Sequence, residues 1–118
     1  MTSMVIIGAG PGGYEAASVA AAGGVEVTVV EETGIGGAAV LTDCVPSKTL
    51  IATAEVTSTL RRAAELGLRH TETFEVDLDA VNFRVRQLAQ AQSDDISRGL
   101  ERKGVRLISG RARLATGA

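Results

Sequence analysis

Three glycines near the start of the sequence have the spacing of a nucleotide-binding turn. Gly8, Gly10 and Gly13 form a Gly-x-Gly-x-x-Gly motif, and Pro11 and Gly12 lie between the second and third glycines. In such a turn the first glycine permits a tight bend, the second lets the backbone approach a pyrophosphate, and the third lets a helix pack closely on a strand. The amides that open the helix then face the negative charge of the phosphates. These five residues therefore predict a dinucleotide site.

The residues around this motif have the pattern of one strand–turn–helix–strand unit. Residues 4–7 form a continuous apolar run, which is typical of a strand buried on both faces of a parallel sheet. Residues 14–22 are rich in alanine, as expected of a helix pressed against a sheet, and residues 25–30 are mostly β-branched, as expected of a second strand. A glycine-rich surface turn without a ligand explains this arrangement less well than a nucleotide site does.

An acidic pair ends the second predicted strand. Glu31 lies eighteen residues after Gly13, close to the roughly 20 residues at which a carboxylate binds the ribose of a dinucleotide. Glu31 therefore favours a ligand with a free 2′-hydroxyl. Glu32 and Thr33 would line the adenosine side by proximity, although solvent exposure explains them equally well. These features do not distinguish FAD from NAD.

A second motif occupies residues 36–48, which run Gly-Gly-Ala-Ala-Val-Leu-Thr-Asp-Cys-Val-Pro-Ser-Lys. Together with the N-terminal Gly-Ala-Gly-Pro-Gly-Gly-Tyr, this segment resembles the FAD domain of the pyridine nucleotide-disulfide oxidoreductase family, which includes dihydrolipoamide dehydrogenase, glutathione reductase and mercuric reductase. In that family two cysteines are separated by four residues, and a hydrophobic residue, Pro, Ser and Lys follow the second. Residues 44–48 match this second half, and the resemblance covers nearly the whole chain.

The resemblance implies FAD as the cofactor and NAD(P)H as the co-substrate of the whole protein. It places Gly37 at the cofactor, Cys44 against the flavin isoalloxazine and Lys48 near the flavin N5 edge. A cation there can stabilise a reduced, anionic flavin. Without the resemblance, Cys44 could be a small buried side chain and Lys48 a solvated helix residue.

The first cysteine of the family motif is replaced by Ala39. Reduction of a disulfide needs an attacking thiolate and a second, resolving thiol, and Cys44 is the one cysteine of this sequence. The segment is similar to the branch of the family formed by NAD(P)H quinone dehydrogenases of the lipoamide-dehydrogenase type, in which the flavin reduces a quinone directly. We therefore expect an oxidoreductase that passes electrons to a quinone. A dihydrolipoamide dehydrogenase-like disulfide reductase homologue and a non-catalytic nucleotide-binding module are the alternatives.

The rest of the sequence predicts a helical insertion and a third strand. Residues 38–66 suggest a short helix, a break and a long helix with Pro46 in a first turn, and Gly67 is expected to end it. Asp77 or Asp79 is expected to cap the next helix, which ends at residues 103–104. Its apolar residues recur at steps of three, four or their multiples: Leu78, Val81, Val85, Leu88, Ile96 and Leu100.

These elements predict an α/β fold. Residues 105–109 have strand character, and residues 111–114 suggest a further short strand. We expect a Rossmann-like, FAD-binding parallel sheet of at least three strands around the strand at residues 4–7. An antiparallel helix pair is inserted between its second and third strands, and the domain is partial.

The end of the chain carries a possible second motif. Ala115-Thr116-Gly117 matches a second FAD motif of the family, but the family normally has a three-stranded meander before it. We interpret the match as accidental or as a truncation, because Arg111 and Arg113 suit a doubly buried strand poorly. Residues 1–118 are then the N-terminal fragment of a longer flavoprotein that has NAD(P)H-binding and dimerisation domains, and the resemblance implies a homodimer.

Composition bounds the remaining possibilities. The chain has 118 residues, 45% hydrophobic and 22% charged, which is typical of one globular domain. A net charge of −2 and 3% aromatic residues argue against a nucleic-acid partner. The apolar run near the N-terminus is too short for a membrane span or a signal peptide. One cysteine forms no intrachain disulfide, so we expect a cytoplasmic protein. No metal site is predicted, and His70 is expected to be a surface residue without a catalytic role.

Overall fold

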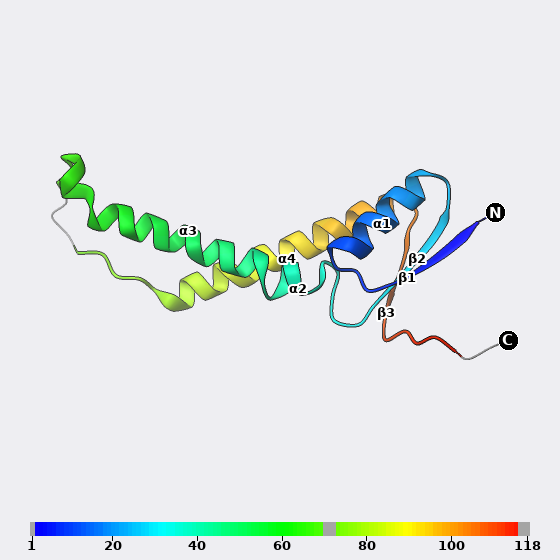
Figure 1. Ribbon diagram of the computed structural model, residues 1–118. Coiled ribbons are helices and arrows are strands. Elements are labelled where there is room, and N and C mark those ends of the chain that lie inside the picture. Colours follow the sequence, from blue (N-terminus) through cyan, green and yellow to red (C-terminus); the bar gives the residue numbers. More distant parts are fainter. Residues whose placement is uncertain (1, 70–72, 116–118) are drawn as a thin grey trace.

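The computed structural model describes residues 2–69 and 73–115. A small parallel sheet lies at one end of the molecule, and two long helices extend from it as an arm (Figure 1). This arm makes the molecule elongated, with extents of 72 × 27 × 17 Å. The sheet and the helix that follows its first strand carry the glycine motif.

The predicted strand–turn–helix–strand unit is confirmed. Strand β1 (Ser3–Ile7) leads through the glycine turn into helix α1 (Pro11–Ala22), and strand β2 (Glu26–Glu31) returns parallel to β1. Strand β3 (Arg106–Ser109) pairs in parallel with β2, so the strand order is β1-β2-β3. The expectation of a sheet arranged around the first strand is therefore wrong, because β2 is the central strand and β1 lies at an edge.

Helices cover one face of the sheet. The register places Ile6, Val29 and Leu107 in one row, and these side chains pack into the core with α1 and the end of α4. The core consists of Ala9, Ala17, Val27, Val29, Leu100 and Val105.

The prediction that β1 is buried on both faces is wrong. Ile7, Val30 and Ile108 form the neighbouring row on the opposite face. No described helix covers that face, and Val5 on the same side of β1 is 66% exposed. An apolar run alone cannot show whether a strand is covered on one face or on two, because the covering segments lie elsewhere in the sequence.

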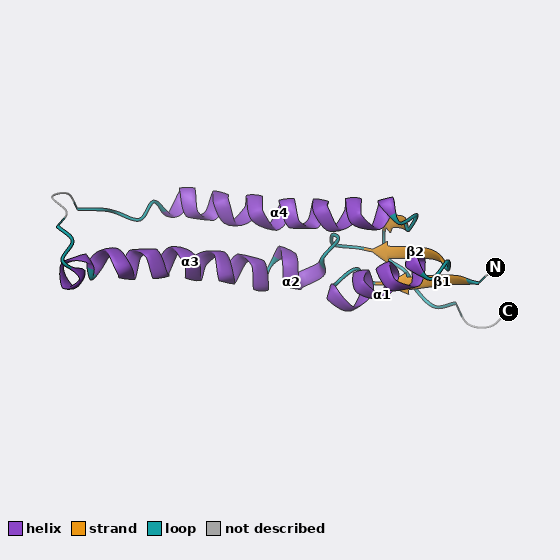
Figure 2. Ribbon diagram, turned by 90° about the horizontal axis from the view of Figure 1, so that it is seen from above, coloured by secondary structure: helices purple, strands orange, loops and turns teal. Residues whose placement is uncertain are grey.

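The arm consists of the predicted antiparallel helices. Helices α2 (Gly37–Leu41) and α3 (Cys44–Arg61) run outward, the short 3-10 helix η1 (Ala63–Leu66) follows α3, and α4 (Leu78–Arg102) returns alongside α3 (Figure 2). The break predicted near Pro46 lies just before α3, so Pro46 occupies the first turn of that helix.

The predicted ends of α4 are confirmed, but the predicted end of α3 is wrong. Helix α3 ends at Arg61, and Gly67 ends η1 instead, in the left-handed conformation with φ of 76°. Asp77 caps α4, since its carboxylate accepts a hydrogen bond of 2.9 Å from the amide of Ala80. At the other end of α4, the Lys103 ammonium donates to the hydroxyl of Ser18 and so joins the arm to α1.

The predicted apolar stripe of α4 is only partly correct. Leu100 is buried, but Leu78 and Leu88 are exposed. Ala89 and Ser93 occupy the closely packed positions between Leu88 and Ile96. A two-helix arm has too few neighbours to bury large side chains along its whole length, and small residues allow the closest contact.

Residues 111–114 do not form the predicted strand. The amide of Gly110 donates to the carbonyl of Glu31 over 2.8 Å, and the chain then leaves the sheet. Within the described residues no further strand is available for pairing at this edge. Thr116, Gly117 and His70 lie outside the described residues. No helix in the described part of the chain is long and apolar enough to cross a membrane.

Candidate nucleotide-binding site

The glycine turn between β1 and α1 depends on two of its glycines for steric reasons. Gly8 has a φ of 95°, a conformation that residues with a side chain rarely adopt. A Cβ on Gly13 would lie 1.9 Å from the carbonyl oxygen of Gly8. The close approach of helix and strand is therefore possible only with glycine at position 13, as the motif predicts.

The outer side of this turn is open. A Cβ placed on Gly10 or Gly12 would meet no atom within 4 Å. Pro11 occupies the first turn of α1, where its missing N–H costs nothing, and the amides of Gly12 and Gly13 have no acceptor within the helix. Open space beside outward-facing helix amides suits the phosphates of a dinucleotide, so the residues present fit such a ligand.

The glycine pair of the second motif, Gly36 and Gly37, packs against the glycine turn between β1 and α1. The amide of Gly36 donates to the carbonyl of Ala9 over 2.8 Å. A Cβ on Gly37 would lie 2.9 Å from the Cα of Gly10, so the two backbones approach closely. The structure therefore brings Gly37 beside the N-terminal motif, although Gly37 lies 27 positions after Gly10 in the sequence.

Glu31 is held by hydrogen bonds at the end of β2. Its Oε2 accepts from the amide of Ala9 (2.6 Å), and its Oε1 accepts from the amide of Thr33 (2.7 Å), the hydroxyl of Thr33 (2.9 Å) and the amide of Gly34 (3.3 Å). Burial raises the pKa of this carboxyl, but the four hydrogen bonds outweigh burial and lower the pKa to about 2. The carboxylate is thus charged at neutral pH.

This carboxylate keeps capacity for a ligand. A carboxylate offers about four acceptor positions, and Oε2 accepts one hydrogen bond, from Ala9, among the described residues. A ribose hydroxyl could donate to the free position on Oε2. Glu31 therefore joins the glycine turn to β2 and can still face a ligand.

A pocket of about 300 Å³ lies at the carboxyl ends of the strands. In open α/β sheets, ligands bind outside these ends. Glu32 and Arg111 form an ion pair of 3.9 Å beside it, and both are exposed. The lining residues are Ile7, Gly8, Val30, Glu31, Glu32, Thr33, Gly110, Arg111 and Ala112.

Residues 110–112 line this pocket although they were not predicted to belong to the site. These residues enter it because β3 pairs with β2 and so ends beside Glu31. The sequence does contain a signal for them, because Gly110 directly follows a predicted strand. The carboxyl ends of parallel strands meet at one edge of a sheet, where ligands bind.

Cys44 and Lys48 lie one helical turn apart at the start of α3. Cys44 is the first residue of α3 and its free thiol is exposed, and Lys48 is exposed as well. Residues spaced by four share one face of a helix. The alternative that Cys44 is a buried hydrophobic residue is therefore wrong. Ala39 lies half-buried in α2, the helix that begins at Gly37.

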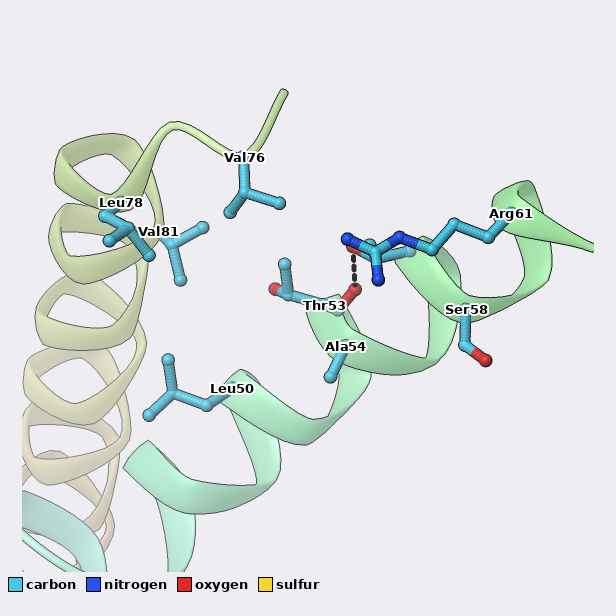
Figure 3. A pocket seen from close by; sticks show the side chains of 9 residues that line it. Leu50, Thr53, Ala54, Ser58, Arg61, Val76, Leu78 and Val81 are labelled. Atoms are coloured by element: carbon cyan, nitrogen blue, oxygen red, sulfur yellow. Dashed lines mark hydrogen bonds between the residues drawn. The ribbon is translucent and has the colours of Figure 1, made fainter. Parts of the chain in front are cut away.

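A larger apolar pocket lies in the arm. Its volume is about 400 Å³, and Leu50 of α3 faces Leu78 and Val81 of α4 across it (Figure 3). Arg61 lies at its far side. No residue of the two glycine motifs lines this pocket, so it is separate from the candidate nucleotide site.

Comparisons with known proteins agree with this geometry. The sequence model of the family described as pyridine nucleotide-disulphide oxidoreductase matches residues 2–118. An NAD(P)H dehydrogenase (quinone) of Mycobacterium tuberculosis is 49% identical over 118 residues, which are 97% of this chain and 24% of that protein. A dihydrolipoyl dehydrogenase of Chlamydia muridarum is 36% identical over 110 residues, which are 93% of this chain and 23% of that protein.

Solved structures show the same fold. The crystal structure of LpdA from Mycobacterium tuberculosis matches with a TM-score of 0.87 at 49% identity, over 94% of this chain and 24% of that one. The flavoprotein disulfide reductase RclA from Escherichia coli matches with a TM-score of 0.74 at 21% identity, over 97% of this chain and 22% of that one, which supports the fold alone. The chain thus spans about a quarter of the length of these relatives.

Proposed function

The chain belongs to the pyridine nucleotide-disulphide oxidoreductase family, and on this basis we propose that it is the FAD-binding part of an NAD(P)H-dependent flavin oxidoreductase. One observation carries the proposal. The glycine turn joins the carboxyl end of a parallel strand to a helix N-terminus, and its outer side is open above Gly10 and Gly12.

Different residues of the chain are proposed to bind different parts of FAD. The backbone of Gly8, Gly10 and Pro11, with the amides of Gly12 and Gly13, would hold the pyrophosphate. The charged carboxylate of Glu31 would accept a hydrogen bond from the ribose, and Glu32 and Gly37 would border the cofactor. When bound, FAD supplies a two-electron centre that takes hydride equivalents from NAD(P)H and delivers electrons to an acceptor.

We propose a quinone as the acceptor. The sequence has one cysteine, and its thiol is free and exposed, whereas a disulfide reductase cycle needs two thiols. With Ala39 at the position of the first thiol, Cys44 cannot form the exchanging pair and acts as a neighbour of the flavin. The ammonium of Lys48 favours negative charge on the flavin. The name of the 49% identical relative supports this choice of acceptor.

A disulfide reductase is the second candidate, because several relatives near 36% identity are dihydrolipoyl dehydrogenases. Ala39 is the residue against it. A non-catalytic nucleotide-binding module is the third, because the sequence has one cysteine and so lacks the thiol pair of the disulfide reductases. We also propose that the whole protein is a cytoplasmic homodimer with small-molecule substrates and no nucleic-acid partner.

The visible absorption spectrum of the intact protein tests these candidates. We expect flavin bands that bleach with NADH or NADPH under anaerobic conditions and return on addition of a soluble naphthoquinone, but not on addition of oxidised lipoamide. Recovery with lipoamide would instead favour the disulfide reductase. Absence of flavin bands even after addition of FAD would refute the flavoprotein proposal and leave the non-catalytic module.

A further inference from the structure

Ser93 is a buried polar residue on α4 that bonds outside its own helix. It is 6% exposed, and its hydroxyl donates to the carbonyl of Ile35, which lies 58 residues earlier, over 2.6 Å. Ser97, one turn further along α4, instead donates to the carbonyl of Ser93 over 2.9 Å. Ser93 therefore joins the helical arm to the loop between β2 and α2, whereas the Ser97 hydroxyl bonds within its own helix.

A series of hydrogen bonds leads from Ser93 to the candidate nucleotide site. Gly36 follows Ile35, and its amide donates to the carbonyl of Ala9. The amide of Ala9 in turn donates to the carboxylate of Glu31. Two hydrogen bonds thus connect α4 to the glycine turn through the loop of residues 32–36, and a third joins the turn to Glu31.

Glu31 holds the first half of this loop through Thr33 and Gly34, and the second half is rich in glycine. Gly34, Gly36 and Gly37 all have positive φ values, of 141°, 100° and 60°. Glycines lose more conformational freedom on ordering than other residues. A tertiary hydrogen bond at Ile35, in the middle of this segment, restricts the loop to the arrangement in which Gly37 meets Gly10.

We propose that Ser93 is a positioning residue for the FAD site, an inference that rests on the proposed function. Ser93 acts through Ile35 and Gly36 and does not itself touch the cofactor. Ser93 holds Gly36 and Gly37 against the glycine turn, so the position of the helical arm and the affinity for FAD are coupled. Such coupling is reciprocal, so bound FAD also stabilises the contact between the arm and the loop.

The affinity of the intact protein for FAD tests the proposal. Ser93→Ala leaves a partly buried carbonyl without its donor, and we expect FAD to bind about tenfold more weakly. Ser97→Ala is the matched control and should bind FAD as the wild type does. Dissociation constants are measured at a temperature at which every variant is fully folded.

Amide hydrogen exchange without FAD provides an independent measurement. We expect Ser93→Ala to accelerate exchange at Gly36, and to leave unchanged the exchange at Gly24, whose amide bonds at the far end of α1. Faster exchange with unchanged FAD affinity would overturn the positioning role and leave a structural bond. No change in either quantity would overturn the proposal entirely. Failure of the wild type to bind FAD would refute the proposed function, and exchange at Gly36 would still show whether Ser93 holds the loop.

Discussion

Replacing Glu31 with glutamine removes the charge that joins the glycine turn to the end of β2. The four hydrogen bonds to this carboxylate outweigh its burial and lower its pKa from 4.5 to about 2. A lowering of the pKa by this amount corresponds to about 3 kcal/mol of folding free energy, and solvent near this half-buried group reduces the effect to about 2 kcal/mol. We expect Glu31→Gln to lose about that much stability at pH 7 without FAD.

The same pKa shift predicts a pH dependence with a defined sign. Between pH 4.5 and about 2 the unfolded chain binds a proton at Glu31 that the folded chain does not. The contribution of Glu31 is therefore fully present above pH 4.5 and is lost as the pH falls to about 2. Glu31→Gln lacks this contribution at every pH, so the two unfolding free energies should converge as the medium becomes acidic.

Urea unfolding, followed by circular dichroism from pH 7 down to pH 2.5, measures this difference. Glu32→Gln is the matched control, because Glu32 is exposed and its carboxylate has one distant ion-pair partner, Arg111. We expect the control to follow the wild type at every pH. A Glu31→Gln variant as stable as the wild type at pH 7, or a stability difference that does not shrink below pH 4.5, would refute this account of the Glu31 hydrogen bonds.

Gly13→Ala should prevent native folding of the turn, because its Cβ would lie 1.9 Å from a backbone oxygen. Thermal unfolding should show the loss of stability, and an FAD titration should show the loss of FAD binding. Gly12→Ala meets no protein atom, so it should keep wild-type stability but lose at least tenfold in FAD affinity if the phosphates lie there; unchanged affinity would place the ligand elsewhere. Asp77→Ala should cost about 1 kcal/mol by removing the cap of α4, whereas Asp79→Ala should not, and chemical denaturation distinguishes them. Lys48→Met should make the flavin midpoint potential more negative by on the order of 30 mV, a tenfold change for a two-electron couple. A potentiometric titration with no such change would contradict the electrostatic role of Lys48.

Local features of the fold could be predicted from the sequence because their causes are local. Backbone geometry at the glycine turn requires glycine at Gly8 and Gly13 whatever surrounds it. The cap at Asp77 and the left-handed end at Gly67 depend on bonds within a few residues. The helix pair was predictable for the same reason, since its composition and caps are local.

Long-range pairing decided what the sequence could not. The apolar run at residues 4–7 is compatible with a central or an edge strand, and the pairing of β3 with β2 places it at the edge. That pairing also brings residues 110–112 to the strand-end pocket. Ser93 lies on the packed face of α4, which the sequence predicts to be apolar. Its hydroxyl is satisfied by the carbonyl of Ile35, which lies 58 residues earlier. The sequence alone therefore determined the glycine turn and the single cysteine of the chain, whereas the tertiary structure determined which distant groups support that turn, because such contacts leave no local pattern.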